Sequence, residues 1–194
     1  MDFFSEFFLD EWIALIFGLI YVLLAAAERA SAWIFGIISC AFWAYGTYIH
    51  YDLYFNMGLN VFYVLMGFYG LYQWLRGGED GQERKIAELP LKQHIIYNGV
   101  GIILSLILGY LFQQYTAANS PYIDAFATIL SIIATFLLVY KIHSNWLYWI
   151  VADSIYLGLY IYTGAQAYAI LFVVNTLIAI YAYWNWWWIR KNQV

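Results

Sequence analysis

Asp153 is an acid placed eight residues into an apolar run that spans residues 146–162 of this 194-residue chain. If that run crosses a membrane, the carboxyl group lies near mid-depth, where it costs several kcal/mol unless it faces water, a partner or a cation. No Lys or Arg lies at a matching depth in any other apolar run. The acid therefore either binds a ligand or, when protonated, forms a structural hydrogen bond to a neighbouring helix.

Aromatic residues share one helical face with this acid. At 100° per residue, five side chains fall within about 80° of one another: Trp146, Trp149, Asp153, Tyr156 and Tyr160. Aromatic rings attract cations by about 0.5–2 kcal/mol each, so this face suits a planar, cationic molecule. Trp149 is the better stacking candidate, because Trp146 lies near the end of the run, where aromatic residues also mark the membrane boundary.

Two other apolar runs carry related faces. The same five offsets in the second run select Trp33, Gly36, Cys40, Trp43 and Thr47, without an acid. A face of the third run holds Asn56, Asn60, Tyr63, Gly67, Gly70 and Trp74, and Asn175 lies at the corresponding depth in the seventh run. Amides and small residues on one face of a membrane helix indicate either helix contact or a cavity. Cys40 is the only cysteine, and we expect it to pack in the core.

The remaining residues give little support for enzyme chemistry. We find no Gly-rich phosphate loop, no nucleophile spaced from a base and no paired acids. His50, His94 and His143 lie at the ends of apolar runs with a spacing that fits no metal cluster, so we expect no metal and no other cofactor. Basic residues occur only in the loops, which argues against a nucleic-acid partner.

Seven apolar runs must position these residues: 11–27, 32–50, 53–75, 95–112, 122–140, 146–162 and 167–189. Each is close to the ~20 residues with which a helix crosses a ~30 Å hydrocarbon core, and none alternates as the strands of a membrane barrel do. The chain is 65% hydrophobic and 10% charged, against ~25% charged residues in soluble domains. The sequence therefore predicts an all-α membrane protein with seven transmembrane helices.

All eight Lys and Arg residues fall on one side of these runs: Arg29, Arg76, Arg84, Lys85, Lys92, Lys141, Arg190 and Lys191. The segments on the other side contain Asp2, Glu6, Asp10 and Asp52 but no Lys or Arg. This positive-inside pattern predicts a cytoplasmic C-terminus and an N-terminus outside. Residues 1–10 lack the basic start of a signal peptide, and we expect them to lie at the outer interface as an amphipathic lead-in.

An internal repeat relates the two ends of the chain. A shift of 113 residues aligns Ser31 with Ser144 and Trp33 with Trp146, and after a one-residue slip Trp74-Leu-Arg76 aligns with Trp188-Ile-Arg190. We therefore expect a 3+1+3 arrangement: a three-helix repeat (11–76), a polar loop (77–94), a linker helix with an outer loop (95–121), and a second three-helix repeat (122–190). Three crossings and one linker helix return the chain to its starting side, so both repeats enter the membrane from the same side and are parallel. A substrate path commonly runs between the halves of such proteins.

Three segments resemble the PnuC-type vitamin transporter family. Ser144-Asn145-Trp146-Leu-Tyr-Trp149-Ile-Val-Ala-Asp153 is similar to the family's N-W-x-x-W…D segment. The segment Asn60-Val-Phe-Tyr63, followed by Tyr69-Gly70-Leu-Tyr-Gln-Trp74, is similar to the third helix of the family. The segment Trp33-Ile-Phe-Gly36-Ile-Ile is similar to the start of the family's second helix. The resemblance covers nearly the whole chain.

The resemblance implies a fold like a doubled three-helix unit of the SWEET sugar transporters. It also implies facilitated diffusion of nicotinamide riboside, or of thiamine or riboflavin in close relatives, with phosphorylation by a cytoplasmic vitamin kinase that keeps the vitamin inside. By this resemblance, substrate binding is assigned to Trp146, Trp149, Asn145, Asn60 and Asn175.

These observations lead to one main hypothesis, a multi-pass transporter of a bacterial cytoplasmic (inner) membrane that takes up a cationic vitamin. Nicotinamide riboside is the first expected substrate and thiamine the second. In this hypothesis Asp153 tunes the charge of the site, and Tyr63, Trp43 and Tyr156 complete it. The alternatives are a non-transporting membrane assembly subunit and a membrane enzyme that acts on lipid. Membrane lipid is a partner in each case, and a homo-oligomer is compatible with such a bundle.

Overall fold

The computed structural model describes residues 8–50, 54–116 and 120–193, and these form seven α-helices. The helices are α1 (Leu9–Ala26), α2 (Ala32–Ile49), α3 (Tyr54–Arg76), α4 (Leu91–Tyr115), α5 (Pro121–Val139), α6 (Asn145–Thr163) and α7 (Gln166–Asn192). A short 3-10 helix, η1 (Glu79–Gly81), lies between α3 and α4. Asp52 and residues 1–7 of the predicted lead-in lie outside the described residues, and Leu9 and Asp10 already belong to α1.

The helices follow the predicted apolar runs closely, and α4 differs most. It begins at Leu91, ahead of the apolar run at 95, because Pro90 provides an extended N-cap residue with φ −60° and ψ 144°. Its first turn contains Lys92, and His94 follows. Long basic side chains near a helix end can reach the membrane interface while their stems cover apolar surface. Hydropathy alone therefore placed the start of this helix too late.

Five of these helices, α1, α2, α4, α5 and α7, are long and apolar enough to be candidate membrane spans. The other two, α3 with 23 residues and α6 with 19 residues, are long enough to cross a ~30 Å core but are more polar. α3 carries Asn56 and Asn60, and α6 carries Asp153. The two more polar helices are thus those that hold most of the polar residues singled out by the sequence.

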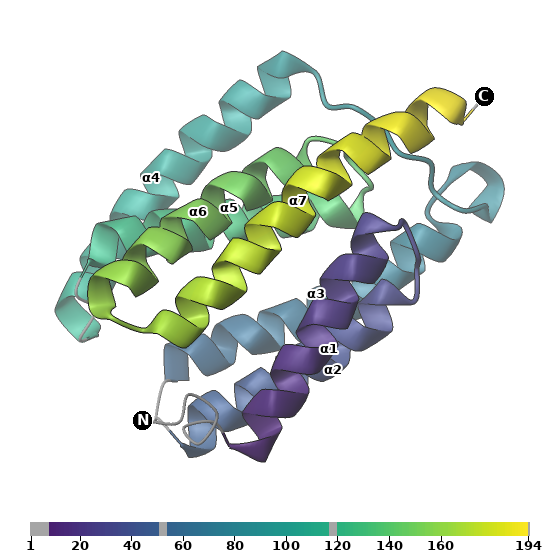
Figure 1. Ribbon diagram of the computed structural model, residues 1–194. Coiled ribbons are helices and arrows are strands. Elements are labelled where there is room, and N and C mark those ends of the chain that lie inside the picture. Colours follow the sequence, from purple (N-terminus) through teal and green to yellow (C-terminus); the bar gives the residue numbers. More distant parts are fainter. Residues whose placement is uncertain (1–7, 51–53, 117–119, 194) are drawn as a thin grey trace. The chain divides into compact units, whose positions relative to one another are not determined.

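The chain divides into two compact units, which Figure 1 shows with their helices labelled. Unit 1, Met1–Lys85, contains α1 to α3, and α2 packs against both of the others. Unit 2, Ile86–Val194, contains α4 to α7, and each helix packs against the next one along the chain. Because consecutive helices reverse direction, the basic residues of each unit gather at one of its ends, which we call the basic end.

Apolar side chains cover the outside of these helices as well as their contacts. Along α4, exposed residues include Ile95, Ile96, Val100, Ile103 and Ile107. Soluble monomers rarely expose large contiguous apolar patches, whereas lipid would cover such a surface.

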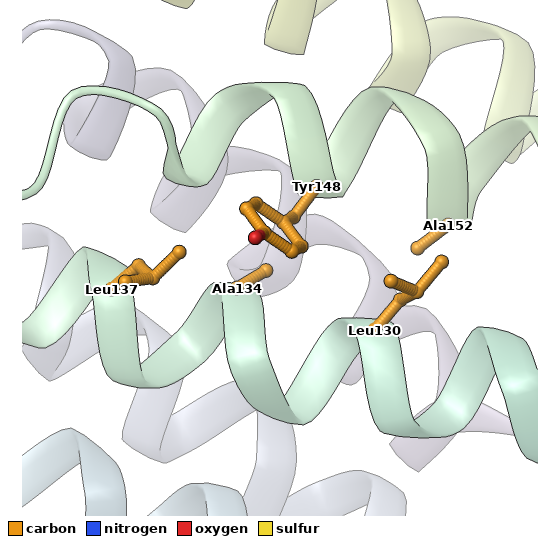
Figure 2. Packing of buried hydrophobic residues seen from close by; sticks show 5 residues of the cluster. All are labelled: Leu130, Ala134, Leu137, Tyr148 and Ala152. Carbon is orange, nitrogen blue, oxygen red and sulfur yellow. The ribbon is translucent and has the colours of Figure 1, made fainter. Parts of the chain in front are cut away.

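The buried core of unit 2 lies between α5 and α6. It is formed by Leu130, Ala134, Leu137, Tyr148 and Ala152, which Figure 2 shows facing one another across the two helices. Small alanines on both helices let their backbones approach closely, as is typical of membrane helix contacts.

The corner between α1 and α2 has the same backbone geometry as the corner between α5 and α6, 113 residues later. In the first corner Glu28 has φ +57°, and Arg29 N donates to Leu24 O at 2.9 Å. In the second corner Lys141 has φ +50°, and Ile142 N donates to Leu137 O at 2.8 Å. Each corner is a Schellman motif with a non-glycine residue in the left-handed region, which is uncommon.

The first half of the segment between α3 and α4 closes on unit 1. Arg84 N donates to Trp74 O at 3.2 Å, and Arg84 Nη2 donates to Gln73 Oε1 at 2.7 Å. These bonds hold the chain against the last turn of α3, where backbone carbonyl groups have no partner within the helix.

The second half of this segment, residues 86–89, binds to the basic end of unit 2, and we call it the strap. Ile86 N donates to Gln193 Oε1 at 3.0 Å. Ala87 pairs with the α5–α6 corner through Lys141 O and His143 N. Glu88 forms an ion pair with Arg190 of α7. The predicted polar loop is therefore a bound segment, and only Lys85 separates the two anchored amides of Arg84 and Ile86.

Candidate substrate site

α6 begins with two buried side chains, Asn145 and Trp146. Asn145 Nδ2 donates to Ile142 O at 2.7 Å, while Asn145 Oδ1 has no partner among the described residues. The ring of Trp146 packs edge-on against Trp186 of α7, with centroids 5.5 Å apart, and Trp146 Nε1 has no described partner. A buried polar atom without a hydrogen bond costs about 1–3 kcal/mol, so both atoms are candidates for contact with a ligand.

Unit 1 contains an equivalent aromatic pair. Trp33 at the start of α2 packs edge-on against Trp74 near the end of α3, with centroids 5.6 Å apart. Trp33 and Trp146, which the sequence predicts to be equivalent, thus each form an edge-on pair with a second tryptophan. The predicted pairing of Trp74 with Trp188 is wrong, because Trp186 occupies the place of Trp74 and Trp188 is 61% exposed. Two residues along a helix turn the side chain by about 200°, so only the earlier tryptophan points at α6.

Asp153 lies in the middle of α6 with 6% of its surface exposed. No described residue forms a hydrogen bond or an ion pair with its carboxyl group. The alternative predicted from the sequence, a structural bond to a neighbouring helix, is therefore not formed by the described residues. A buried carboxyl group without a partner is suited to a cationic ligand, because the ligand supplies the missing charge.

Trp149 lies one turn before Asp153 on the same face of α6. It is half-buried and packs against the α5–α6 core. Its ring is thus supported from one side by apolar neighbours, while part of its surface is left uncovered. A stacking residue needs a held ring with surface that a ligand can reach, and a half-buried Trp149 packed on the core meets this need in part.

The far end of the same face forms a contact between helices. Tyr156 Oη lies 3.1 Å from Thr128 Oγ1 of α5, and the ring of Tyr156 lies 5.1 Å from the ring of Phe172 of α7. Tyr160 contacts Phe172 as well, at 5.3 Å. Tyr156 therefore joins α6 to both of its neighbours.

The amide-bearing face of α3 in unit 1 divides into two parts. Near the basic end it packs on α2: a Cβ atom added at Gly70 would lie 2.5 Å from the ring of Trp33. Towards the other end Asn60 is half-buried, and its Nδ2 donates to Asn56 O at 2.9 Å. The glycine part is thus a helix contact, whereas the amide part is free of such close packing.

The predicted site residues are distributed over both units. Trp43, Asn60 and Tyr63 belong to unit 1, and Asn145, Trp146, Trp149, Asp153, Tyr156 and Asn175 belong to unit 2. Within unit 2, the structure joins Trp146 to α7 and Trp149 to the α5–α6 core. Asn175 is half-buried on α7, and its side chain, like that of Asp153, has no hydrogen-bond partner among the described residues.

Residues 9–188 match the family model described as Nicotinamide mononucleotide transporter. The chain belongs to this transporter family. The family is one of membrane transporters and not of enzymes, which confirms the multi-pass transporter predicted from the sequence and sets aside the lipid-acting enzyme and the assembly subunit.

Several curated relatives of this chain are named as nicotinamide riboside transporters. The Nicotinamide riboside transporter PnuC of Escherichia coli (strain K12) is 25% identical in an alignment that covers 88% of this chain and 81% of the relative. The protein of the same name from Haemophilus influenzae is 27% identical, with 91% of this chain and 80% of the relative covered. That of Neisseria mucosa is 24% identical, with 91% and 72% covered.

A solved structure shares the fold of this family member. The crystal structure of the Vitamin B3 transporter PnuC superposes with a TM-score of 0.76 at 21% identity, and covers 95% of this chain and 83% of that chain. The family model and the curated relatives confirm the resemblance to PnuC-type transporters, and this structure shows that the fold is shared.

The sequence did not predict two structural features of this family member, the role of Trp186 and the hydrogen bonds between α6 and α4. Trp186 could have been found, because the offset that relates the two corners also brings Trp74 close to Trp186. The hydrogen bonds that join Tyr148 of α6 to His94 and Asn98 of α4 had no local signal. His94 and Asn98 lie 54 and 50 residues before Tyr148 in the chain, so no local spacing points to them.

Proposed function

We propose that the chain takes up nicotinamide riboside across the cytoplasmic (inner) membrane by facilitated diffusion. The observation that carries this proposal is the buried, unpartnered carboxyl group of Asp153, one turn from the half-buried ring of Trp149. The nicotinamide ring of the riboside carries a fixed positive charge, which a carboxylate and an aromatic face both attract. The names of the relatives in E. coli, H. influenzae and N. mucosa support this choice of substrate.

The same site favours the riboside over the mononucleotide in the family's description. A nucleotide phosphate carries about −1.5 to −2 charge near neutral pH. Lys and Arg residues lie at the basic ends of the two units and not beside Asp153. A phosphate carried next to this acid would therefore meet repulsion without a compensating cation.

In this proposal Trp149 stacks on the nicotinamide ring and Asp153 provides the counter-charge. Asn145 and Trp146 offer their unpartnered Oδ1 and Nε1 atoms, and Asn175 offers a further amide, to the polar groups of the substrate. Tyr156 holds α6 against α5 and α7. The binding roles of Trp43, Asn60 and Tyr63 in unit 1 stay predictions.

The proposed topology has seven spans in a 3+1+3, SWEET-like arrangement of two parallel repeats, with the N-terminus outside and the C-terminus in the cytoplasm. The matched Schellman corners and the matched tryptophan pairs support the repeat, and the basic end of each unit supports the orientation. Rocking of the repeats would expose the site to each side in turn. Phosphorylation by a cytoplasmic vitamin kinase would keep the product inside.

Binding of nicotinamide riboside to the purified protein, measured by calorimetry, tests this proposal. We expect Trp149→Ala to raise the Kd by roughly 5- to 150-fold, which corresponds to loss of about 1–3 kcal/mol of stacking and cation–π attraction. We expect Asp153→Asn to remove the preference for the cationic riboside over its reduced, uncharged dihydro form, because the amide keeps the shape of the carboxyl group without its charge.

Trp188→Ala is the matched control, because it removes an exposed indole from the end of α7. It should bind like the unmodified protein. If the unmodified protein binds thiamine and not nicotinamide riboside, the substrate assignment is wrong while the cationic site stands. If Trp149→Ala and Asp153→Asn both bind like the unmodified protein, the site itself is wrong.

A further inference from the structure

A chain of hydrogen bonds joins the linker helix α4 to the start of α6. Asn98 Nδ2 donates to Tyr148 Oη at 3.1 Å, and Tyr148 Oη lies 3.0 Å from His94 Nδ1. On the other side of the ring, His94 Nε2 lies 3.2 Å from Ser144 Oγ, at the N-cap of α6. The rings of His94 and Tyr148 also stack, with centroids 5.8 Å apart. We call these four residues the brace.

One protonation pattern satisfies the whole brace with a neutral imidazole. Tyr148 accepts from Asn98 and donates its hydroxyl hydrogen to His94 Nδ1, which leaves the ring hydrogen on Nε2 to be donated to Ser144. Every member then has a hydrogen-bond partner within the brace, which runs from the buried ring of Tyr148 to the exposed Asn98.

Tyr148 is fixed at both ends of its side chain. Its ring lies in the core among Leu130, Ala134 and Leu137 of α5, as Figure 2 shows, while its hydroxyl is held by α4. Since successive helical residues are 100° apart, fixing the direction of Tyr148 also fixes the directions of Trp149 and Asp153 on the same helix.

Unit 1 has no equivalent of this hydroxyl. The offset of 113 residues that relates the corners places Phe35 at the position of Tyr148 and Cys40 at the position of Asp153. Phe35 packs against Phe17 of α1, at 5.7 Å, and has no group that could form such a bond. Tyr148, the central residue of the brace, and the buried Asp153 therefore occur together on α6 of unit 2.

We propose that Tyr148 is a positioning residue for the substrate site, and that its hydroxyl, held by His94 and Asn98, sets the rotation of α6 and so aims Trp149 and Asp153 at the ligand. This inference rests on the proposed function, because it assigns the brace a role in binding nicotinamide riboside. Tyr148 itself touches the core and the linker helix and not the ligand.

Tyr148→Phe keeps the ring in the core and removes the hydroxyl. We expect it to bind nicotinamide riboside about three- to tenfold more weakly, the range that corresponds to one lost hydrogen bond. Tyr162→Phe is the matched control on the same helix, since Tyr162 is 76% exposed, and it should bind like the unmodified protein. His94→Phe removes both ring nitrogens and should weaken binding to a similar extent.

Two readouts separate positioning from a purely structural role. In the double variant Tyr148→Phe/His94→Phe, positioning predicts a loss of affinity smaller than the sum of the two single losses, because both changes break the bond between Tyr148 and His94. A structural role predicts a lower unfolding temperature with an unchanged Kd for the folded protein. If Tyr148→Phe does not fold, the comparison is made with His94→Phe.

The outcomes keep this inference distinct from the proposed function. If the unmodified protein binds nicotinamide riboside and both single variants bind it equally well, the positioning role is wrong while the function stands. If the unmodified protein does not bind nicotinamide riboside, the proposed function is wrong and the role of the brace is lost with it.

Discussion

At the scale of single residues, two buried acids show what burial demands of a carboxyl group. Glu11 Oε2 accepts a hydrogen bond from Phe8 N at 2.9 Å, at the start of α1, where the helix dipole favours a negative charge. Asp153 lies in the middle of α6 without a partner among the described residues. The same chemical group is therefore paired in one place and without a partner among the described residues in the other.

His143 predicts how stability depends on pH. Burial lowers the pKa of this imidazole, and Arg190 lowers it further, while its bond to Tyr183 O and the nearby Glu88 oppose the shift. The unfolded chain therefore binds a proton more readily than the folded protein. Stability from this group is present above the ordinary histidine pKa of ~6.5 and is lost as the pH falls through that value towards the folded pKa.

The change that tests this expectation is His143→Gln, whose amide can still donate to Tyr183 O, the partner of His143 Nε2 at 2.9 Å. Thermal unfolding from pH 8 to pH 5 should show a shallower loss of stability in the variant than in the unmodified protein. Parallel curves would show that His143 does not contribute to acid sensitivity.

Some residues could be read from the sequence, and others could not. The depth of Asp153 in an apolar run was enough to predict its burial. Lys141 follows an apolar run, and the sequence predicted a cytoplasmic loop there, yet its side chain is fully buried. The strap pairs with this corner from about fifty residues away in the chain, and no local pattern reveals such a contact.

At the scale of elements, α3 is closely fitted to α2 through Gly70. Gly70→Ala would place a Cβ atom 2.5 Å from the ring of Trp33, which is itself packed on Trp74. Overpacking of this kind typically costs about 1–3 kcal/mol. We expect the apparent unfolding temperature of the detergent-solubilised protein to fall.

Gly58→Ala is the matched control in the same helix, because a Cβ atom at Gly58 meets no other atom within 4 Å. Alanine favours the helix by up to ~1 kcal/mol over glycine, so this variant should be neutral or slightly stabilised. Equal effects of the two substitutions would show that α2 and α3 are not closely packed at Gly70.

The sequence predicted the helices well because each one follows an apolar run of about 20 residues. Their ends were harder to predict, because polar residues extend a helix beyond its apolar run, as Lys92 and His94 do in α4. The face of α3 was predicted as one surface, whereas the structure divides it at the glycines that contact α2. Spacing indicates which side chains share a face, but only packing decides what that face contacts.

At the scale of the whole molecule, the two units share several local structural features. Each has a Schellman corner, a serine at the following N-cap and a buried pair of tryptophans. They differ in chemistry, because the brace and Asp153, a buried acid without a partner among the described residues, belong to unit 2. The similarity of the two corners could be predicted from weak sequence similarity, whereas the hydrogen bonds of Tyr148 could not.

Uptake of labelled nicotinamide riboside into proteoliposomes is the most direct test of the central claim. We predict uptake well above that of empty liposomes, which ends when the inner concentration equals the outer concentration, because a facilitator only equilibrates its substrate. Absence of uptake above empty liposomes would contradict transport of this vitamin. Accumulation beyond the outer concentration under an imposed pH gradient would contradict facilitated diffusion.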